Sequence, residues 1–182
     1  MSLLRRSLFA VPALAVPALA EAGRAEAQKT LVVPLKWYAV QVEDNAFTVE
    51  MPGIPDHRVV NDKSARGTVF ALHSYSLEIG GYSYVAQTAL YPDDVDTTQP
   101  RRIIQAALDG RAPQLATRKW TKVDWREIDA GASAESVGPL KGGNMLRQLV
   151  LLKGRRFVSL AFLGAIVTSV EAERFFKSLK LK

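Results

Sequence analysis

Two apolar runs near the C-terminus constrain the fold of this chain more than any other feature. Residues 144–152 read NMLRQLVLL, residues 156–163 read RFVSLAFL, and Lys153, Gly154 and Arg155 separate them. Strands that are apolar at nearly every position are typical of strands buried on both faces of a sheet. We therefore expect these two runs to form a hairpin at the centre of a sheet.

A second hairpin is predicted upstream. Residues 68–77 and 82–91 are rich in Val, Tyr, Phe and Thr, and Gly80 and Gly81 lie between them. A glycine pair supplies the positive φ that a tight reversal needs. Alternation along the first run predicts two faces, one with Val69, Ala71, His73, Tyr75 and Leu77, the other with Phe70, Leu72, Ser74 and Ser76.

Shorter segments fill the remaining chain. Residues 47–51 alternate between apolar and polar side chains, and the sequence PGIPD then ends this predicted strand. Residues 121–129 are predicted as a strand, and residues 131–143 as a loop. Residues 28–36 form a leader or an edge strand, because Pro34 argues against a central strand.

Two amphipathic helices complete the predicted elements. The first follows Asp96, Thr97 and Thr98, whose oxygens can cap it; Pro100 suits its first turn and Gly110 its end. The second begins with a capping box of Thr168 and Glu171. The helical spacing predicts that these residues are buried: Ile103, Ile104, Ala107 and Leu108 in the first helix, and Ala172, Phe175, Phe176 and Leu179 in the second.

These elements predict one domain of the α+β class over residues 28–182. Two strand-rich blocks, each followed by a helix, give an antiparallel sheet packed by two main helices. A chain of this length buries enough surface for a single core. The 182-residue sequence contains no cysteine, so no disulfide, thiolate nucleophile or lipid-modified cysteine contributes.

Residues 1–27 have the pattern of a signal peptide. Arg5 and Arg6 precede an apolar run over residues 8–20, which Pro12 and Pro17 interrupt. A membrane-spanning helix needs about 20 apolar residues, so this run is too short for an anchor. The paired arginines leave a twin-arginine export route open beside the general one.

Cleavage of this leader fits two positions. Small residues at the A-x-A spacing precede a cut after Ala20 or after Ala27, and we favour Ala27 because residues 21–27 are small, polar and without periodicity. The mature chain is then periplasmic or secreted and has no transmembrane helix. Export argues against a nucleic-acid partner, although Lys and Arg exceed Asp and Glu by 24 to 18.

Basic side chains form two groups in the sequence. One group interleaves with Trp120 and Trp125, and the other lies at the turn of the C-terminal hairpin. Cations mixed with aromatic rings can bind polyanions, and in an envelope the polyanion would be an anionic lipid or a polysaccharide. The candidate anion-binding residues are Arg118, Lys119, Lys122, Arg126, Lys153, Arg155 and Arg156. The alternative is a solvated basic surface with both tryptophans in the core.

Groups that could carry catalysis are few. His73 is expected to be partly buried and hydrogen-bonded in its strand, and His57 to be solvated in a turn. Residues 93–96 contain three aspartates, which we interpret as acids at a helix N-terminus rather than a calcium site. Gly142 and Gly143 precede a strand and not a helix, which excludes a phosphate loop. No catalytic, cofactor-binding or metal-ligating residue is predicted.

Several motifs, taken in order, resemble a known family. The chain resembles small exported bacterial proteins of uncharacterised function that have a PsbP-like α/β/α sandwich. The resemblance covers residues 37–182 and rests on Phe47-x-Val49-x-Met51-Pro52-Gly53-x-Pro55, Tyr91-Pro92, Arg155-Arg156-Phe157 and the terminal E-x-E-R-F-F-K-S-L-K-L. It implies a fold and a compartment, and it supplies no active site. PsbP-like domains more often bind partners than catalyse.

The sequence therefore favours a non-enzymatic exported domain that binds or supports an envelope partner. The partner is an envelope protein or an anionic lipid or polysaccharide. One alternative is a small-ligand carrier with an apolar cavity between the sheet and its helices. Another is an enzyme that uses His73 together with tyrosines or carboxylates brought close by folding.

Overall fold

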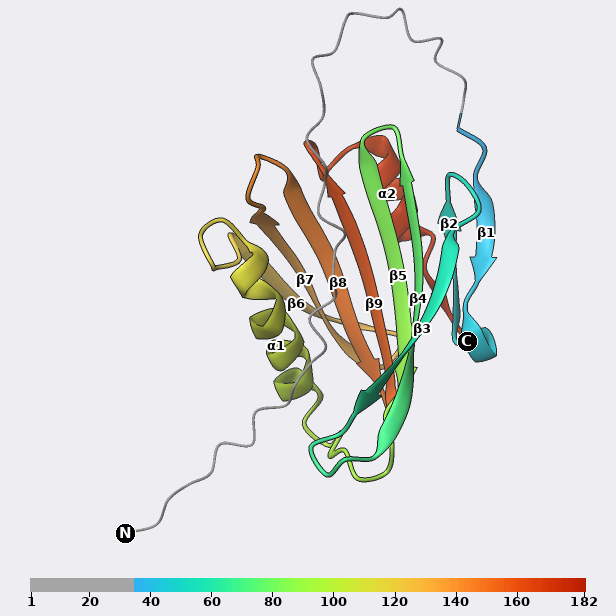
Figure 1. Cartoon of the computed structure of the whole chain (residues 1–182), viewed down its shortest axis with the longest axis vertical. Helices are drawn as coiled ribbons and strands as arrows, with labels where there is room; N and C mark the ends of the chain where they lie inside the picture. Colours follow the sequence, from blue (N-terminus) through green and yellow to red (C-terminus); the bar gives the residue numbers. More distant parts are fainter. Residues whose placement is uncertain (1–34) are drawn as a thin grey trace, which may run out of the picture.

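The computed structural model describes residues 35–182, which form two antiparallel sheets and two α-helices (Figure 1). The larger sheet has the strand order β3-β4-β5-β9-β8-β7-β6. Strand β9 is the middle strand of this sheet and pairs with β8, which confirms the predicted central hairpin. The strands are β3 Asp56–Lys63, β4 Val69–Ile79, β5 Tyr82–Leu90, β6 Lys122–Ile128, β7 Gly131–Pro139, β8 Met145–Lys153 and β9 Arg156–Gly164.

The second predicted hairpin is also confirmed. Strands β4 and β5 are joined by Gly80 and Gly81 alone, with φ values of 60° and 79° that favour glycine. The predicted alternation along β4 holds, because Tyr75 lies in one core cluster and Leu72 in another, on opposite faces of the sheet.

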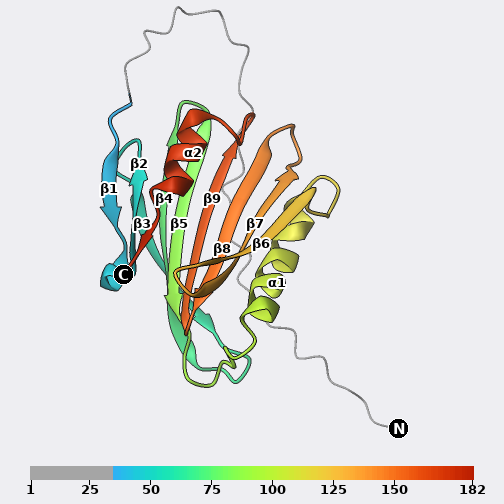
Figure 2. The same cartoon turned by 180° about the vertical axis from the view of Figure 1, so that it is seen from behind.

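One face of the large sheet is covered by α2 and the small sheet (Figures 1 and 2). Three of the four residues predicted for the apolar stripe of α2 are buried, Ala172, Phe175 and Phe176, whereas Leu179 follows the helix and is half-buried. The Phe175 ring meets Tyr84 edge to face, with centroids 5.4 Å apart. The elements here are β1 Tyr38–Gln41, η1 Glu43–Asn45, β2 Phe47–Met51, α2 Val170–Lys177 and β10 Lys180–Leu181, and the small sheet has the order β1-β2-β10.

The other face is covered by α1 (Pro100–Arg111), followed by the short η2 (Ala112–Gln114). Ile104 and Leu108 are fully buried against the sheet, as the helical spacing predicts. Leu115 follows directly and packs on β7, where a Cβ at Gly138 would come within 3.0 Å of its side chain. Small residues in β7 therefore let this end of the α1 layer approach the sheet closely.

Two strands of the large sheet escape prediction, as do the short strands β1 and β10 of the small sheet. Residues 131–143 contain β7 and are not a loop; the small and polar sequence GASAESVGP lacks the large apolar residues that mark a strand. Strand β3 follows the PGIPD turn, and all but one of its residues are exposed, so no apolar alternation marks it. His57 lies in this strand and not in a turn. Both strands are identified by their pairing with strongly apolar or aromatic neighbours.

The helix N-termini also differ from prediction. Helix α1 is preceded by Gln99, whose side chain makes no capping bond, and its first turn has no acidic residue. The cap of α2 is Ser169, whose Oγ accepts a hydrogen bond from the Ala172 N–H at 3.2 Å, so the predicted capping box of Thr168 and Glu171 is wrong. The α1 helix also continues one residue past Gly110.

The predicted signal peptide, residues 1–27, lies outside the described residues, as does most of the predicted leader or edge strand over residues 28–36. Its last two residues, Leu35 and Lys36, are not in a strand; the first strand begins at Tyr38. Within residues 35–182, no helix is both long enough and apolar enough to cross a bilayer.

Candidate functional site

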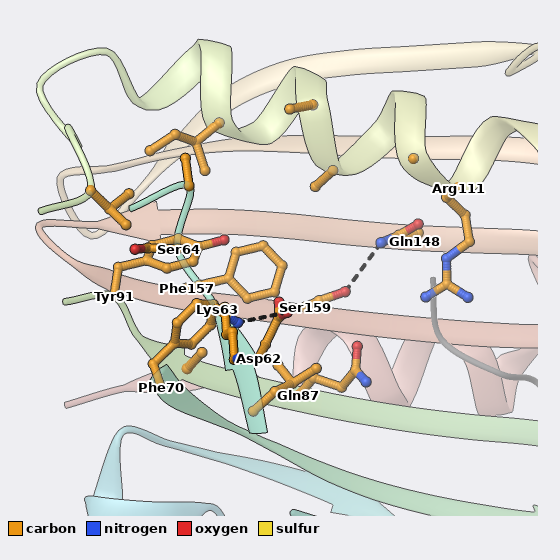
Figure 3. A pocket seen from close by; sticks show the side chains of 18 of the residues that line it. Asp62, Lys63, Ser64, Phe70, Gln87, Tyr91, Arg111, Gln148, Phe157 and Ser159 are labelled. Atoms are coloured by element: carbon orange, nitrogen blue, oxygen red, sulfur yellow. Dashed lines mark hydrogen bonds between the residues drawn. The ribbon is translucent and has the colours of Figure 1, made fainter. Parts of the chain in front are cut away.

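A pocket opens between α1 and the large sheet, with a cavity volume of about 70 Å³ (Figure 3). Its floor comes from β4, β5, β8 and β9, one wall comes from α1, and the turn after β3 forms part of the rim. Figure 3 shows aromatic rings gathered at one end of this α1 pocket and Arg111 at the other. The apolar lining is Phe70, Leu72, Ala89, Tyr91, Val95, Ile103, Ala107 and Phe157.

Three charged residues line the α1 pocket, Asp62, Lys63 and Arg111, and of these Arg111 alone is buried. It is 8% exposed, and its Nη1 donates one long hydrogen bond, 3.3 Å, to Gln114 Oε1. Among residues 35–182 no carboxylate pairs with it. Burial lowers the pKa of Arg111 to about 10, so the guanidinium remains charged at neutral pH. A buried cation without a counter-charge is costly, which makes this end of the pocket a place for an anion.

Amides and hydroxyls lie on the sheet beside Arg111. Gln148 is 3% exposed; its Nε2 donates to Ser159 Oγ at 3.2 Å, while its buried Oε1 accepts no hydrogen bond within the described part of the chain. Gln87, also buried, donates to Ser74 Oγ at 3.2 Å. Buried polar groups are normally paired, so the free acceptor on Gln148 is a second group that a ligand could satisfy.

At the other end of the α1 pocket, Tyr91 packs on Phe70 and Phe157, with ring centroids 5.4 and 5.9 Å away. Burial raises the pKa of Tyr91 to about 12, so its hydroxyl stays neutral at physiological pH. The pocket therefore combines a cationic end with an aromatic end. This arrangement suits a molecule that carries an anionic group and an apolar part.

Our sequence analysis missed Arg111, although a signal was present. Arg111 follows Ile104 by seven residues and Ala107 by four, so it falls on the apolar stripe of α1. Charged residues are rarely buried, so a charged residue in such a stripe marks a candidate functional position. Gln87 and Gln148 also lie at buried strand positions, where a polar side chain interrupts an apolar run.

The predicted basic residues do not gather into one patch. Arg118, Lys119 and Lys122 lie near the start of β6. This end of β6 pairs with the end of β7, and the end of β7 pairs in turn with the start of β8. The second group, Lys153, Arg155 and Arg156, lies at the far end of the same strand β8. Lys122 lies in register with Arg147, six residues of strand and roughly 20 Å from Lys153, whereas Arg126 lies in register with Leu151, two residues from Lys153.

Several of these cations also have acidic partners. Lys122 Nζ lies 2.6 Å from Asp124, Arg126 pairs with Glu135, and Arg155 pairs with Asp93. The two tryptophans pack under α1, where Trp120 Nε1 donates to the Leu108 carbonyl at 3.0 Å. Anion binding by the basic surface stays a prediction, and the two tryptophans on which it partly rested are half-buried against the core.

The three aspartates before α1 have separate partners. Asp93 pairs with Arg155, and Asp94 accepts hydrogen bonds from Ser64 at 2.6 Å and Thr68 at 2.9 Å, which ties the β3–β4 turn to this segment. Asp96 accepts from the backbone and hydroxyl of Thr98. These bonds lower the pKa of Asp94 and of Asp96. The aspartates therefore order the loop before the helix and lie outside its first turn.

His73 lies on the sheet face opposite the α1 pocket. As expected, it is half-buried with polar neighbours: its Nδ1 is 3.3 Å from His57 Nε2 and 3.6 Å from Glu43 Oε2. An enzyme that uses His73 remains a prediction, since a general base would need a substrate in reach of this ring.

Comparisons with models of known protein families and with curated proteins give no match. Among solved structures, the chain is similar to cyanobacterial PsbP (CyanoP) from Synechocystis sp. PCC 6803, with a TM-score of 0.50 and 11% sequence identity. The likeness covers 85% of this chain and 98% of that one. The fold is PsbP-like, which confirms the fold that the sequence motifs implied.

Proposed function

We propose that this PsbP-like domain binds a small organic anion in the α1 pocket. The observation that carries the proposal is Arg111, a buried guanidinium with no carboxylate partner among residues 35–182. A guanidinium presents paired N–H donors that match a carboxylate, so a carboxylate is the group we expect there. This function develops the small-ligand alternative that the sequence left open.

The size and lining of the pocket restrict the ligand. The apolar lining favours an alkyl chain or a ring next to the carboxylate, and the cavity of about 70 Å³ admits only a small one. The polar groups beside Arg111 are amides and hydroxyls, which bind and orient a ligand but do not exchange protons readily at neutral pH. Binding without chemistry is therefore the activity that these residues support.

We expect the domain to bind its ligand outside the cytoplasm, after export. Residues 1–27 as a signal peptide and residues 28–182 as one exported domain remain our proposal for the chain. Cell fractionation with N-terminal sequencing of the mature protein tests it: we expect a periplasmic or secreted protein that begins after Ala20 or Ala27. A cytoplasmic protein that keeps Met1 would contradict export. Association with an envelope partner would place a ligand carrier near its source or acceptor.

Calorimetric titration tests the pocket. We expect short unbranched alkanoates, hexanoate as the first probe, to bind with one site per chain, and hexanamide to bind far more weakly because it lacks the charge. Arg111→Met should abolish hexanoate binding, whereas Arg102→Met, on the exposed side of the same helix, should leave it unchanged. Equal binding of hexanoate to the wild type and to Arg111→Met would refute the proposal.

A further inference from the structure

The chain contains two histidines, and the β3–β4 pairing brings them together on the face opposite the α1 pocket. His57 lies across from Tyr75 and His73 across from Val59, so the histidines are diagonal neighbours on one face. Their ring nitrogens, Nε2 of His57 and Nδ1 of His73, are 3.3 Å apart. Sixteen residues of sequence separate them, and neither has another histidine to pair with.

A carboxylate completes the group. Glu43 comes from η1, which belongs to the layer packed over this face, and its Oε2 lies 3.6 Å from His73 Nδ1. The three ligand atoms, one from each residue, all lie within 4.8 Å of one another. The three residues thus reach one point from three separate elements.

The two separations from His73 Nδ1, 3.3 Å to His57 and 3.6 Å to Glu43, are close to those of a metal site. Bonds of 2.0–2.2 Å from a tetrahedral zinc ion to nitrogen and oxygen place neighbouring ligand atoms roughly 3.3–3.5 Å apart. We propose that His57 Nε2, His73 Nδ1 and Glu43 Oε2 bind one divalent transition-metal ion of the zinc type. Imidazole and carboxylate ligands suit this class of ion, whereas magnesium and calcium prefer oxygen ligands alone.

Tyr75 positions two of the ligands. Its ring stacks on His57 with centroids 4.3 Å apart and an angle of 12° between planes. The pKa of Tyr75 is raised by burial, against a hydrogen bond from the Glu43 backbone that lowers it, so the phenol lies beside Glu43 as well. Because Tyr75 is itself 9% exposed and fixed in the core, the ligands are held near their binding geometry before the ion arrives.

The site has room for a further ligand. Three protein ligands leave at least one position of a tetrahedral ion open, and His57 is exposed, so water or a group from another molecule can complete the coordination. Without the ion, the N–H of one imidazole donates a hydrogen bond to the other ring across the 3.3 Å contact. Metal binding requires both contact nitrogens to carry a free lone pair, so the donor ring must adopt the tautomer that has its proton on the opposite ring nitrogen.

The proposal is tested by titrating the full chain, produced without a histidine tag, with ZnCl2. We expect one zinc ion per chain, and a Co²⁺ derivative with the visible absorption of a four-coordinate ion. Histidine ring ¹⁵N spectra should show the ion on Nε2 of His57 and Nδ1 of His73. His57→Ala and His73→Ala should each lower zinc affinity by at least roughly 100-fold, which is the effect of losing a strong supporting contact. Glu43→Gln should lower zinc affinity by about 10-fold.

The control is Glu127→Gln, which removes an exposed carboxylate from β6 and should leave affinity unchanged. Circular dichroism melts without metal establish that each variant is folded; exposed His57 is the safest position to change. The proposal is wrong if the wild type binds no zinc, or if both histidine variants bind it as tightly as the wild type. Neither result bears on hexanoate binding, because the α1 pocket is on the other face.

Discussion

Two buried arginines on opposite faces of the sheet differ in the polar partners that surround them. Arg147, from β8, is 9% exposed on the α2 face; its guanidinium meets Glu135 at 2.7 Å, Glu173 at 2.5 Å and the Val167 carbonyl at 3.2 Å. Arg111, on the α1 face, is equally buried, but within residues 35–182 its side chain has only the 3.3 Å bond to Gln114.

The difference separates a charge that the fold compensates from a charge that the described residues leave largely uncompensated. Two carboxylates and a carbonyl compensate Arg147, and the Phe176 ring lies 4.4 Å from its guanidinium carbon. Arg111 gains from its place in the last turn of α1, where the helix dipole favours a cation by up to about 1 kcal/mol. That gain offsets only part of the cost of burial, so the fold carries a charge that a ligand would complete.

The comparison is tested most strongly by removing the compensated charge. Arg147→Met keeps much of the side-chain volume but leaves Glu135 and Glu173 without their shared partner, so we expect a loss of about 3–5 kcal/mol in the free energy of unfolding. Urea denaturation measures it. Arg126→Met is the matched control, because Arg126 pairs with the same Glu135 from the exposed edge and should cost under about 1 kcal/mol. Equal losses would remove the distinction.

Removing the uncompensated charge should have the opposite sign. Arg111→Met replaces a buried cation with an apolar side chain of similar reach, and we expect the free energy of unfolding to rise by about 1–2 kcal/mol. The same urea experiment applies, in the absence of any carboxylate. Arg102→Met, exposed on the same helix, should change stability by less than about 0.5 kcal/mol. A destabilised Arg111→Met would mean that Arg111 supports the fold.

A smaller contrast concerns the helix N-termini. Ser169 caps α2 through its bond to the Ala172 N–H, so Ser169→Ala should cost about 1 kcal/mol. Gln99 precedes α1 without a capping bond, and Gln99→Ala should leave stability nearly unchanged. Thermal unfolding of both variants compares the two ends. If Gln99→Ala costs as much as Ser169→Ala, the cap of α2 is not what distinguishes them.

The sequence predicted the parts of the fold that depend on apolar burial. The central strands β8 and β9, the two faces of β4 and the buried stripe of α2 all follow from side chains such as Phe162 and Phe175, which have no stable place but the core. Strand β7 was missed because its residues are small, and their size matters only once Leu115 and α1 are packed against them.

The candidate sites were less predictable, because each depends on pairing across the sheet. His57 could not be placed beside His73 while the polar strand β3 went unrecognised. Glu43 joins them only when the small sheet layer packs over the same face. The α1 pocket could have been anticipated in part, since Arg111 interrupts an apolar stripe, but its lack of a counter-charge is a property of the folded chain.

The smallest expected effect concerns the acid sensitivity of the compensated arginine. The hydrogen bond from Arg147, with Lys177 3.2 Å away, lowers the pKa of Glu173 below its usual 4.5. A lowered carboxylate pKa contributes stability above the unfolded-state pKa, and this contribution is lost as the pH falls through the folded-state value. Between about pH 5 and 3, urea midpoints of the wild type should therefore fall more than those of Glu173→Gln. Glu173 is 35% exposed, so the difference should stay below about 1 kcal/mol. Parallel midpoints would show that Glu135 alone compensates Arg147.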